Sequence, residues 1–189
     1  NLTSSTYLPF PDPLSLSSDG TDLTLSCSNG KWSYKKGRDI ALTRFNGTVK
    51  MAEGASSSTN KLVISTVTGN PTLTFEKVDI KPTGGAALTI NADCALTINI
   101  ADEGTSTLSS SGASTLVNKG ILTLTGKGLY IGNTGTIDTH YGLDNSGTFT
   151  VTDPSSTSVT FHCAGTAIHN TGTGKLGNAW MEWQFAEAP

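Results

Sequence analysis

The feature that most constrains the fold is a run of residues that occurs three times. The run "LVNKGILTLTG" (Leu116–Gly126) returns as "LDNSGTFTVTD" (Leu143–Asp153) and, in weaker form, as "IHNTGTGKLGN" (Ile168–Asn178). A fixed period of this length is the sequence signature of solenoids and other repeat architectures. Four asparagines align the copies at separations of 27, 27 and 25 residues: Asn91, Asn118, Asn145 and Asn170.

Within each period the apolar residues alternate, as in β-strands. In "ILTLTG" (Ile121–Gly126) the residues Leu122 and Leu124 share one face and Thr123 takes the other. A second strand follows in "GLYIG" (Gly128–Gly132), and a third is expected just before each asparagine. A meander of hairpins would instead place turns about every 8–12 residues. The sequence therefore predicts an all-β fold, a single-stranded right-handed parallel β-helix of about five coils.

The composition agrees with this class. The 189 residues include 30 Thr and 21 Ser, whereas charged residues are only 14%, against about 25% in ordinary domains. Threonine favours strands because its branched Cβ suits a pleated surface. The net charge of −3 argues against a nucleic-acid partner, and no segment is apolar for long enough to be a membrane span.

Stacking of coils assigns a role to each column of residues. The four aligned asparagines are expected to stack at one corner, which should be distorted at Asn91 because no Gly follows it. At this corner Gly120, Gly147 and Gly172 are expected to permit positive φ. The interior ladder is predicted to contain Leu73, Leu96, Leu122 and Phe149. The outward column is predicted to contain Thr74, Thr97, Thr123 and Thr150.

Regular threonine arrays on β-helices can bind ice. The column next to the outward threonines is expected to be irregular, which disfavours such an array and makes β-propensity the better explanation. That neighbouring column is predicted to contain Thr72, Ala95, Ile121 and Thr148.

We expect one domain over residues 1–189. Residues 1–30 would form an N-terminal cap and first strand, residues 60–178 the repeats, and residues 179–189 an aromatic C-terminal cap that covers the open end of the helix. The basic run "KWSYKKGR" (Lys31–Arg38) is interpreted as a solvated loop, with a phosphate or sugar-acid contact as the alternative. The chain begins without Met, which indicates that a leader has been removed.

Three cysteines, Cys27, Cys94 and Cys163, cannot all pair with one another. The two expected states are three reduced, packed thiols, or one disulfide beside one free thiol. No zinc spacing such as C-x-x-C occurs, so no cofactor is expected, and calcium is the one metal left open.

The runs "LVNKGILTLTG" and "LDNSGTFTVTD" resemble the coils of bacterial surface β-helices, namely autotransporter passengers and haemagglutinin-like adhesins. The stretch "GGAALTINADCALTINIADEGTSTL" (Gly84–Leu108) is similar to coils of secreted carbohydrate-binding β-helix proteins of gut and cellulose-degrading bacteria. The resemblance covers roughly residues 60–178. It implies an extracellular or cell-surface protein that binds polysaccharide or a host or cell-surface glycan.

The favoured function is a carbohydrate-binding or adhesive module without catalytic activity. The alternatives are a purely structural segment of a larger surface protein and, third, a polysaccharide lyase or hydrolase. The third is disfavoured because the two arginines, Arg38 and Arg44, lie outside the repeats and the acids are scattered. Tyr130, which is expected to point outward between apolar neighbours, is the best aromatic stacking candidate. His169 is expected to lie next to Asp144 in the following coil. The predicted ligand-binding residues are Tyr130, Asp138, His140, Tyr141 and Asp144.

Overall fold

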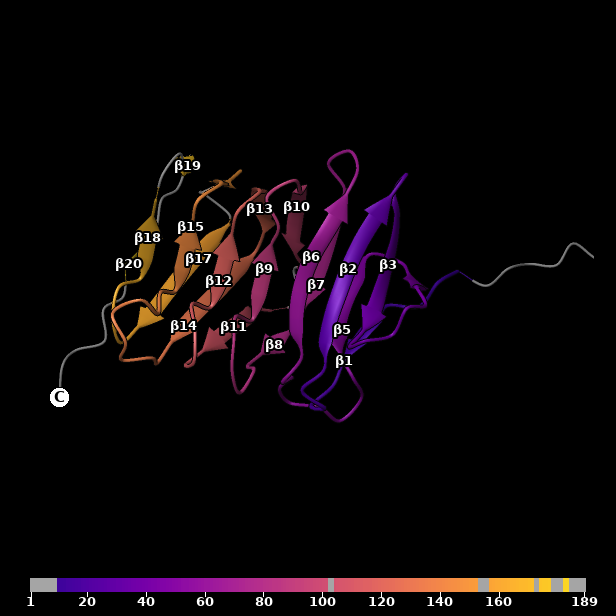
Figure 1. The fold of residues 1–189 in the computed structure, drawn as a ribbon, viewed down its shortest axis with the longest axis horizontal. Coiled ribbons are helices and arrows are strands. Elements are labelled where there is room, and N and C mark those ends of the chain that lie inside the picture. The colour runs from indigo at the N-terminus through magenta and orange to yellow at the C-terminus, as the bar shows by residue number, and fades with distance from the viewer. Residues whose placement is uncertain (1–9, 102–103, 153–156, 172–173, 178–181, 184–189) are drawn as a thin grey trace, which may run out of the picture.

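The structure, a computed structural model, describes residues 10–101, 104–152, 157–171, 174–177 and 182–183. These residues form a parallel β-solenoid of about four turns, somewhat fewer than the five that the repeat predicts. Chain order follows the long axis of the molecule, so the colours in Figure 1 progress from one end to the other. The all-β class and the parallel solenoid are thus confirmed, with no helix among the described residues. The right-handed sense stays a prediction.

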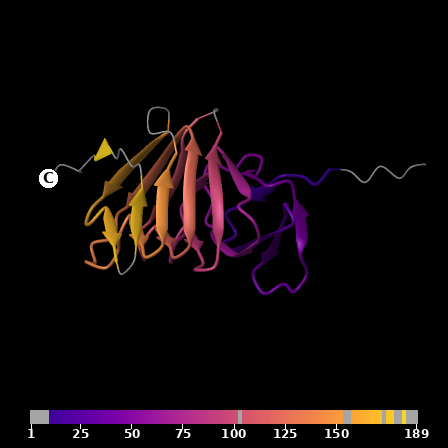
Figure 2. The same ribbon diagram turned by 90° about the horizontal axis from the view of Figure 1, so that it is seen from above.

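Three sheets run along the solenoid, and the strands of successive turns lie side by side in them (Figures 1 and 2). Sheet A contains, in spatial order, β1 (Leu14–Leu16), β5 (Thr48–Met51), β7 (Thr72–Glu76), β10 (Ala95–Ile100), β13 (Ile121–Gly126), β16 (Thr148–Val151) and β19 (Lys175–Gly177). Sheet B contains β4 (Thr43–Phe45), β3 (Lys31–Lys36), β2 (Asp22–Ser28), β6 (Lys61–Val67), β9 (Leu88–Ile90), β12 (Leu116–Asn118), β15 (Leu143–Asn145) and β18 (Ile168–Asn170). Sheet C contains β8 (Asp79–Ile80), β11 (Ser106–Ser110), β14 (Gly128–Asn133), β17 (Ser158–Cys163) and β20 (Glu182–Trp183).

One turn contributes one strand to each sheet, as the sequence predicts. Strands β9, β10 and β11 make one such turn, and β12, β13 and β14 pair with them in parallel in the next turn. The inward side chains of all three sheets meet in one core, and each turn covers the apolar face of its neighbours. Burial of each leucine or isoleucine in this core contributes about 1.5–3 kcal/mol. In sheet B the fully buried ladder runs through Leu62, Leu88, Leu116 and Leu143.

The register of β7 differs from the predicted one by two residues. Leu73 pairs with Ile98 rather than with Leu96, and Thr72 rather than Thr74 pairs with Thr97. A shift of two keeps every leucine inside and every threonine outside, so the hydrophobic pattern cannot distinguish the two registers. The prediction for these columns was therefore wrong about the register of β7, but it assigned the inward and outward residues correctly.

The shift produces two neighbouring outward columns on sheet A that consist mostly of threonine. The first column is Thr72, Thr97, Thr123 and Thr150. The second column is Thr48, Thr74, Asn99 and Thr125. On the other side of the first column, the predicted irregular column is confirmed for Ala95, Ile121 and Thr148. The prediction was wrong for Thr72, which belongs to the first column.

The asparagine column forms a chain of hydrogen bonds along the corner. Asn118 Nδ2 donates to Asn145 Oδ1 over 2.8 Å, and Asn145 Nδ2 donates to Asn170 Oδ1 over 2.7 Å. Asn91 does not join the column, because Asn118 pairs with Ile90 and the corner after Asn91 is longer. The buried Asn118 Oδ1 consequently finds no hydrogen-bond partner among the described residues, as expected where a ladder of amides ends.

The corner glycines are required for space rather than for positive φ. Neither Gly120 nor Gly147 has a positive φ, contrary to the prediction, and Gly172 lies outside the described residues. A Cβ added at Gly147 would overlap the carbonyl oxygen of Gly120, and one added at Gly120 would overlap that of Cys94. The backbones of successive turns thus approach each other too closely at this corner for any side chain.

The basic run 31–38 was wrongly interpreted as a loop. Residues 31–36 form β3, which pairs antiparallel with β2 on one side and with β4 on the other. Trp32 is buried and its Nε1 donates to the carbonyl of Thr72 over 2.9 Å, which anchors the hairpin to the solenoid. The signal in the sequence was the alternation of Trp32 and Tyr34 between polar residues.

The three cysteines are free and buried, which confirms the packed, reduced state. Burial raises the pKa of each thiol. The C-terminal cap predicted for 179–189 lies outside the described residues, apart from the two residues of β20.

Gly147→Ala should destabilise the protein by about 2–3 kcal/mol, because the added methyl forces two backbones apart. Gly165→Ala is the matched control, since a Cβ there has no neighbour within 4 Å and φ is not positive. Thermal unfolding followed by circular dichroism measures both. Equal stability of the two variants would contradict the proposed close approach.

Asp19→Asn should lower stability at neutral pH and have little effect at strongly acidic pH. The ammonium of Lys36, 2.6 Å from the carboxylate, and the Thr21 N–H hold the pKa of Asp19 well below its usual range. The carboxylate therefore stabilises the fold above the ordinary pKa of aspartate, and this stabilisation is lost as the pH falls through the lowered pKa.

Melting temperatures measured from pH 7 downward test this dependence. The control is Asp39→Asn, an exposed acid shortly after β3 that forms no ion pair among the described residues. If the melting temperatures of Asp19→Asn and the parent protein differed by the same amount at every pH, the role of the charge would be contradicted.

Candidate functional site

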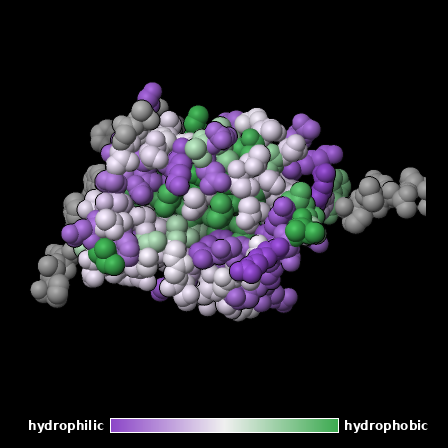
Figure 3. Space-filling model, in the orientation of Figure 1, coloured by the Kyte–Doolittle hydropathy of each residue, from purple (hydrophilic) through white to green (hydrophobic). Residues whose placement is uncertain are grey.

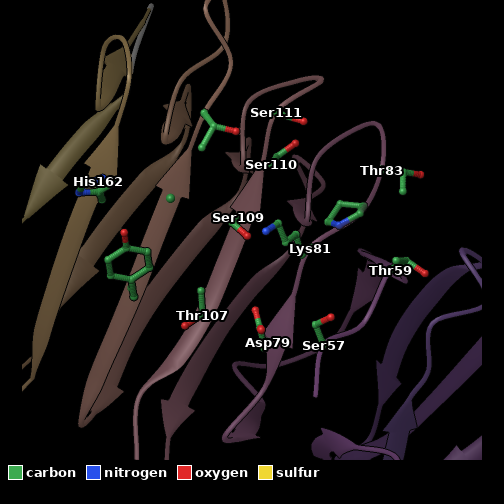
Figure 4. Close-up of a pocket in the computed structure, with 14 residues that line it drawn as sticks. Ser57, Thr59, Asp79, Lys81, Thr83, Thr107, Ser109, Ser110, Ser111 and His162 are labelled. Carbon is green, nitrogen blue, oxygen red and sulfur yellow. The ribbon is translucent and has the colours of Figure 1, made fainter. Parts of the chain in front are cut away.

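A cleft lies on the outer face of sheet C and has a volume of about 750 Å³ (Figure 4). It crosses β8, β11, β14 and β17, so it follows the solenoid axis and not the strands. Its lining residues are mostly hydroxyl-bearing: Ser57, Thr59, Asp79, Lys81, Pro82, Thr83, Thr107, Ser109, Ser110, Ser111, Tyr130, Gly132, Thr134 and His162.

Tyr130 stands at one end of this cleft. Its neighbours in β14, Leu129 and Ile131, are 2% and 0% exposed, so the alternation of the strand turns the phenol outward, as predicted. The ring stacks on that of His162, with centroids 6.2 Å apart and planes at 24°. The Tyr130 hydroxyl is a hydrogen-bond donor at neutral pH, and burial raises its pKa still further from neutrality.

Gly132 makes room for this aromatic pair. It pairs with Ser109 on one side and His162 on the other, and a Cβ there would lie 3.2 Å from Cε1 of Tyr130. The missing side chain leaves a depression between two outward residues. The tyrosine ring leans over this depression toward the histidine.

The other end of the cleft carries the charges. Asp79 and Lys81 lie two residues apart and both line the cavity, as Figure 4 shows. Partial burial raises the pKa of Asp79, and the positive charge of Lys81 opposes this effect. Ser110 Oγ donates to the carbonyl of Gly85 over 2.7 Å, which holds the loop after β8 against β11. The cleft thus combines one carboxylate, one ammonium, one imidazole and many hydroxyls.

The structure distributes the five predicted site residues over three places. Tyr141 and Asp144 lie together beside sheet B. The ring of Tyr141 stacks on that of His169, with centroids 4.2 Å apart and planes at 20°. His169 Nδ1 lies 3.1 Å from Asp144 Oδ1, in agreement with the pairing predicted for these positions. Tyr130 belongs instead to the sheet C cleft.

The two remaining predicted residues lie in the loop between β14 and β15. His140 Nδ1 is 3.2 Å from the carbonyl oxygen of Ser111, whereas Asp138 is exposed and makes none of these contacts. Asn133 is buried and holds the loop in place, since its Nδ2 donates to the Tyr141 carbonyl over 2.9 Å and its Oδ1 accepts from the Gly135 N–H.

Sequence reasoning missed three other residues of the cleft, namely Asp79, Lys81 and His162. They are brought together by strand pairing across turns whose loops differ in length. A partial signal was the run "SSS" (Ser109–Ser111), which interrupts the alternation of threonine and apolar residues.

Within the described part of the chain, no three His, Cys, Asp or Glu residues come together to hold a metal ion. Calcium binding stays a prediction. No helix of the described residues has the length and apolarity to cross a membrane. Residues of hydrophilic or intermediate hydropathy cover most of the face seen in Figure 3, with small hydrophobic groups at its centre and toward both ends.

The fold and the cleft define the chain as a β-solenoid with a hydroxyl-lined groove on one sheet. No protein family, curated protein or solved structure matches the chain.

Proposed function

We propose that this protein is a non-catalytic carbohydrate-binding module and that the cleft on sheet C holds the glycan. The observation that carries this proposal is the Tyr130–His162 stack inside a cavity lined by hydroxyls. A sugar ring has an apolar face of C–H groups and an edge of hydroxyls. The aromatic surface suits the apolar face, and serine and threonine suit the edge.

The direction of the cleft indicates the shape of the ligand. The cavity crosses four neighbouring strands, which are spaced by about 4.8 Å, so it extends over roughly 14 Å along the axis. This length fits a short stretch of linear glycan better than a single sugar. The acid and the base at the far end, Asp79 and Lys81, would fix the orientation of the chain by charge-assisted hydrogen bonds.

The number of carboxylates in the cleft favours a binding function over hydrolysis. Glycoside hydrolysis commonly uses two carboxyl groups on either side of the bond, and among its described lining residues the cleft contains one, Asp79. An extracellular or cell-surface location suits a glycan-binding module and forms part of the proposal.

Tyr130→Ala should weaken glycan binding about tenfold, because the stacking surface is lost. Tyr130→Phe should retain most of the affinity. A glycan array followed by calorimetry with the best ligand measures both. The control is Tyr141→Ala. This variant removes the aromatic residue beside sheet B, outside the cleft, and should leave the affinity unchanged.

The outcomes separate the alternatives. Loss of binding in Tyr141→Ala alone would place the site beside sheet B. No retention on any glycan, with and without calcium, would favour a structural segment of a larger surface protein. Release of reducing or unsaturated products would indicate a hydrolase or lyase.

The two threonine columns of sheet A suggest a second candidate function, ice binding. The register places Thr72, Thr97, Thr123 and Thr150 beside Thr74, Asn99 and Thr125. Hydroxyl and methyl groups therefore repeat about every 4.8 Å along the axis and about every 6.7 Å across it. These spacings are close to those between oxygen atoms on faces of hexagonal ice. Asn99 and the tied hydroxyl of Thr152, which donates to Leu124 O, reduce the regularity.

Thr123→Tyr tests the ice-binding candidate, because a bulky ring at the centre of the array prevents close approach to a flat lattice. Inhibition of ice recrystallisation by the parent protein, lost in Thr123→Tyr, is the result expected of an ice-binding face. Thr89→Tyr, on the outer face of sheet B, is the control. Growth of ice crystals unaffected by the parent protein would eliminate this function.

A further inference from the structure

A second groove lies at the N-terminal end of the solenoid, between the segment 10–13 and the β3–β4 hairpin. Its volume is about 890 Å³. The hydrogen bond from the Asn46 N–H to the Asp12 carbonyl, 3.1 Å long, holds the segment against the end of β4. Two residues of the basic run, Lys31 and Tyr34, line this groove.

Part of the lining of this groove consists of aromatic rings that pack against one another. Phe45 is only 3% exposed and contacts the rings of Trp32 and Tyr34, with centroids 6.0 and 5.9 Å away. Trp32 is itself bonded to the solenoid through Thr72, so the hairpin cannot easily shift. Phe10, which is 89% exposed, adds an accessible ring from the other segment.

Two cations line the same groove. Lys31 and Arg44 are exposed, and neither forms an ion pair with any of the residues that the structure describes. Nearby lysines differ in this respect, since Lys36 pairs with Asp19 at 2.6 Å and Lys61 with Asp22 at 3.0 Å. Among the described lining residues the one acid is Asp12, so positive charge is in excess there.

We propose that this groove is a second binding site, for a sugar residue that carries a carboxylate. The guanidinium of Arg44 can bind a carboxylate through two parallel hydrogen bonds, and Lys31 supplies a further positive charge. The rings of Tyr34 and Phe10 suit the apolar face of a sugar ring. The net charge of −3 over the whole chain disfavours a polyanion such as a nucleic acid and suits a ligand with one isolated charge.

The proposal predicts a difference between two probes that share the same neutral part. The protein should bind 3′-sialyllactose at least about tenfold more tightly than lactose, as measured by calorimetry at low salt. Equal binding of the two sugars, or no binding of either, would overturn the proposal.

Arg44→Gln and Lys31→Gln should each weaken binding of sialyllactose about tenfold, whereas Arg38→Gln, the same loss of charge outside the groove, should not. Arg44→Lys should restore only part of the affinity. An equal loss in Arg38→Gln would mean diffuse attraction and would overturn the site. Displacement of the sugar by inorganic phosphate at equal concentration would also overturn it, since it would indicate a simple anion site. Melting curves verify that each variant is folded.

The site is independent of the cleft on sheet C. Tyr130→Ala should leave the affinity for sialyllactose unchanged. If Tyr130→Ala abolished binding and Arg44→Gln did not, the acidic sugar would belong to the cleft, and the second site would fail while the proposed function remained.

Discussion

The close approach of successive turns at the glycine corner is the contact on which the rest of the structure depends. The carbonyl of Gly120 accepts the Thr148 N–H over 2.8 Å, and the equivalent carbonyl of Cys94 accepts the Ile121 N–H over 2.8 Å. A side chain at this corner would separate the turns locally. All three sheets share the same spacing between turns, so the separation would weaken strand pairing and core packing in each of them. The asparagine chain beside the corner reinforces the same spacing with side-chain hydrogen bonds.

Period and alternation predicted the strands well because both follow directly from stacking. A repeat of about 27 residues with alternating leucines can bury its apolar face only against a copy of itself. The register of β7 was beyond this reasoning, since a shift by two residues buries the same face at equal cost. The N-terminal hairpin was missed for a different reason. Its lysines indicate solvent exposure, and the two aromatic residues between them outweigh that signal by packing on Phe45.

The candidate site was predictable only where it obeyed the repeat. Asp144 and His169 were expected to be neighbours because one spacing of the repeat separates them, and Tyr130 was expected to face outward because its neighbours are apolar. The sheet C cleft depends on pairings such as that of Thr107 with Asp79, across loops of unequal length. A ligand site built from unequal loops leaves no fixed spacing in the sequence. Its composition, rich in serine, was the one trace.

The positions of the two grooves, the cleft on sheet C and the groove at the N-terminal end, follow from the regularity of the outer face of a solenoid. Where every turn presents the same residue, the surface is a flat column, as on sheet A. In the described part of the chain, one groove forms where a side chain is missing, at Gly132, and the other where the repeat gives way to a hairpin, at β3 and β4. Both grooves belong to one continuous stack of turns. A polymer that reached both would be held by two weak contacts at a high effective concentration, which strengthens binding without any new contact. Such a polymer would need a neutral stretch for the cleft and an acidic residue for the cationic groove. Selection of that combination would come from the fixed distance between the two grooves.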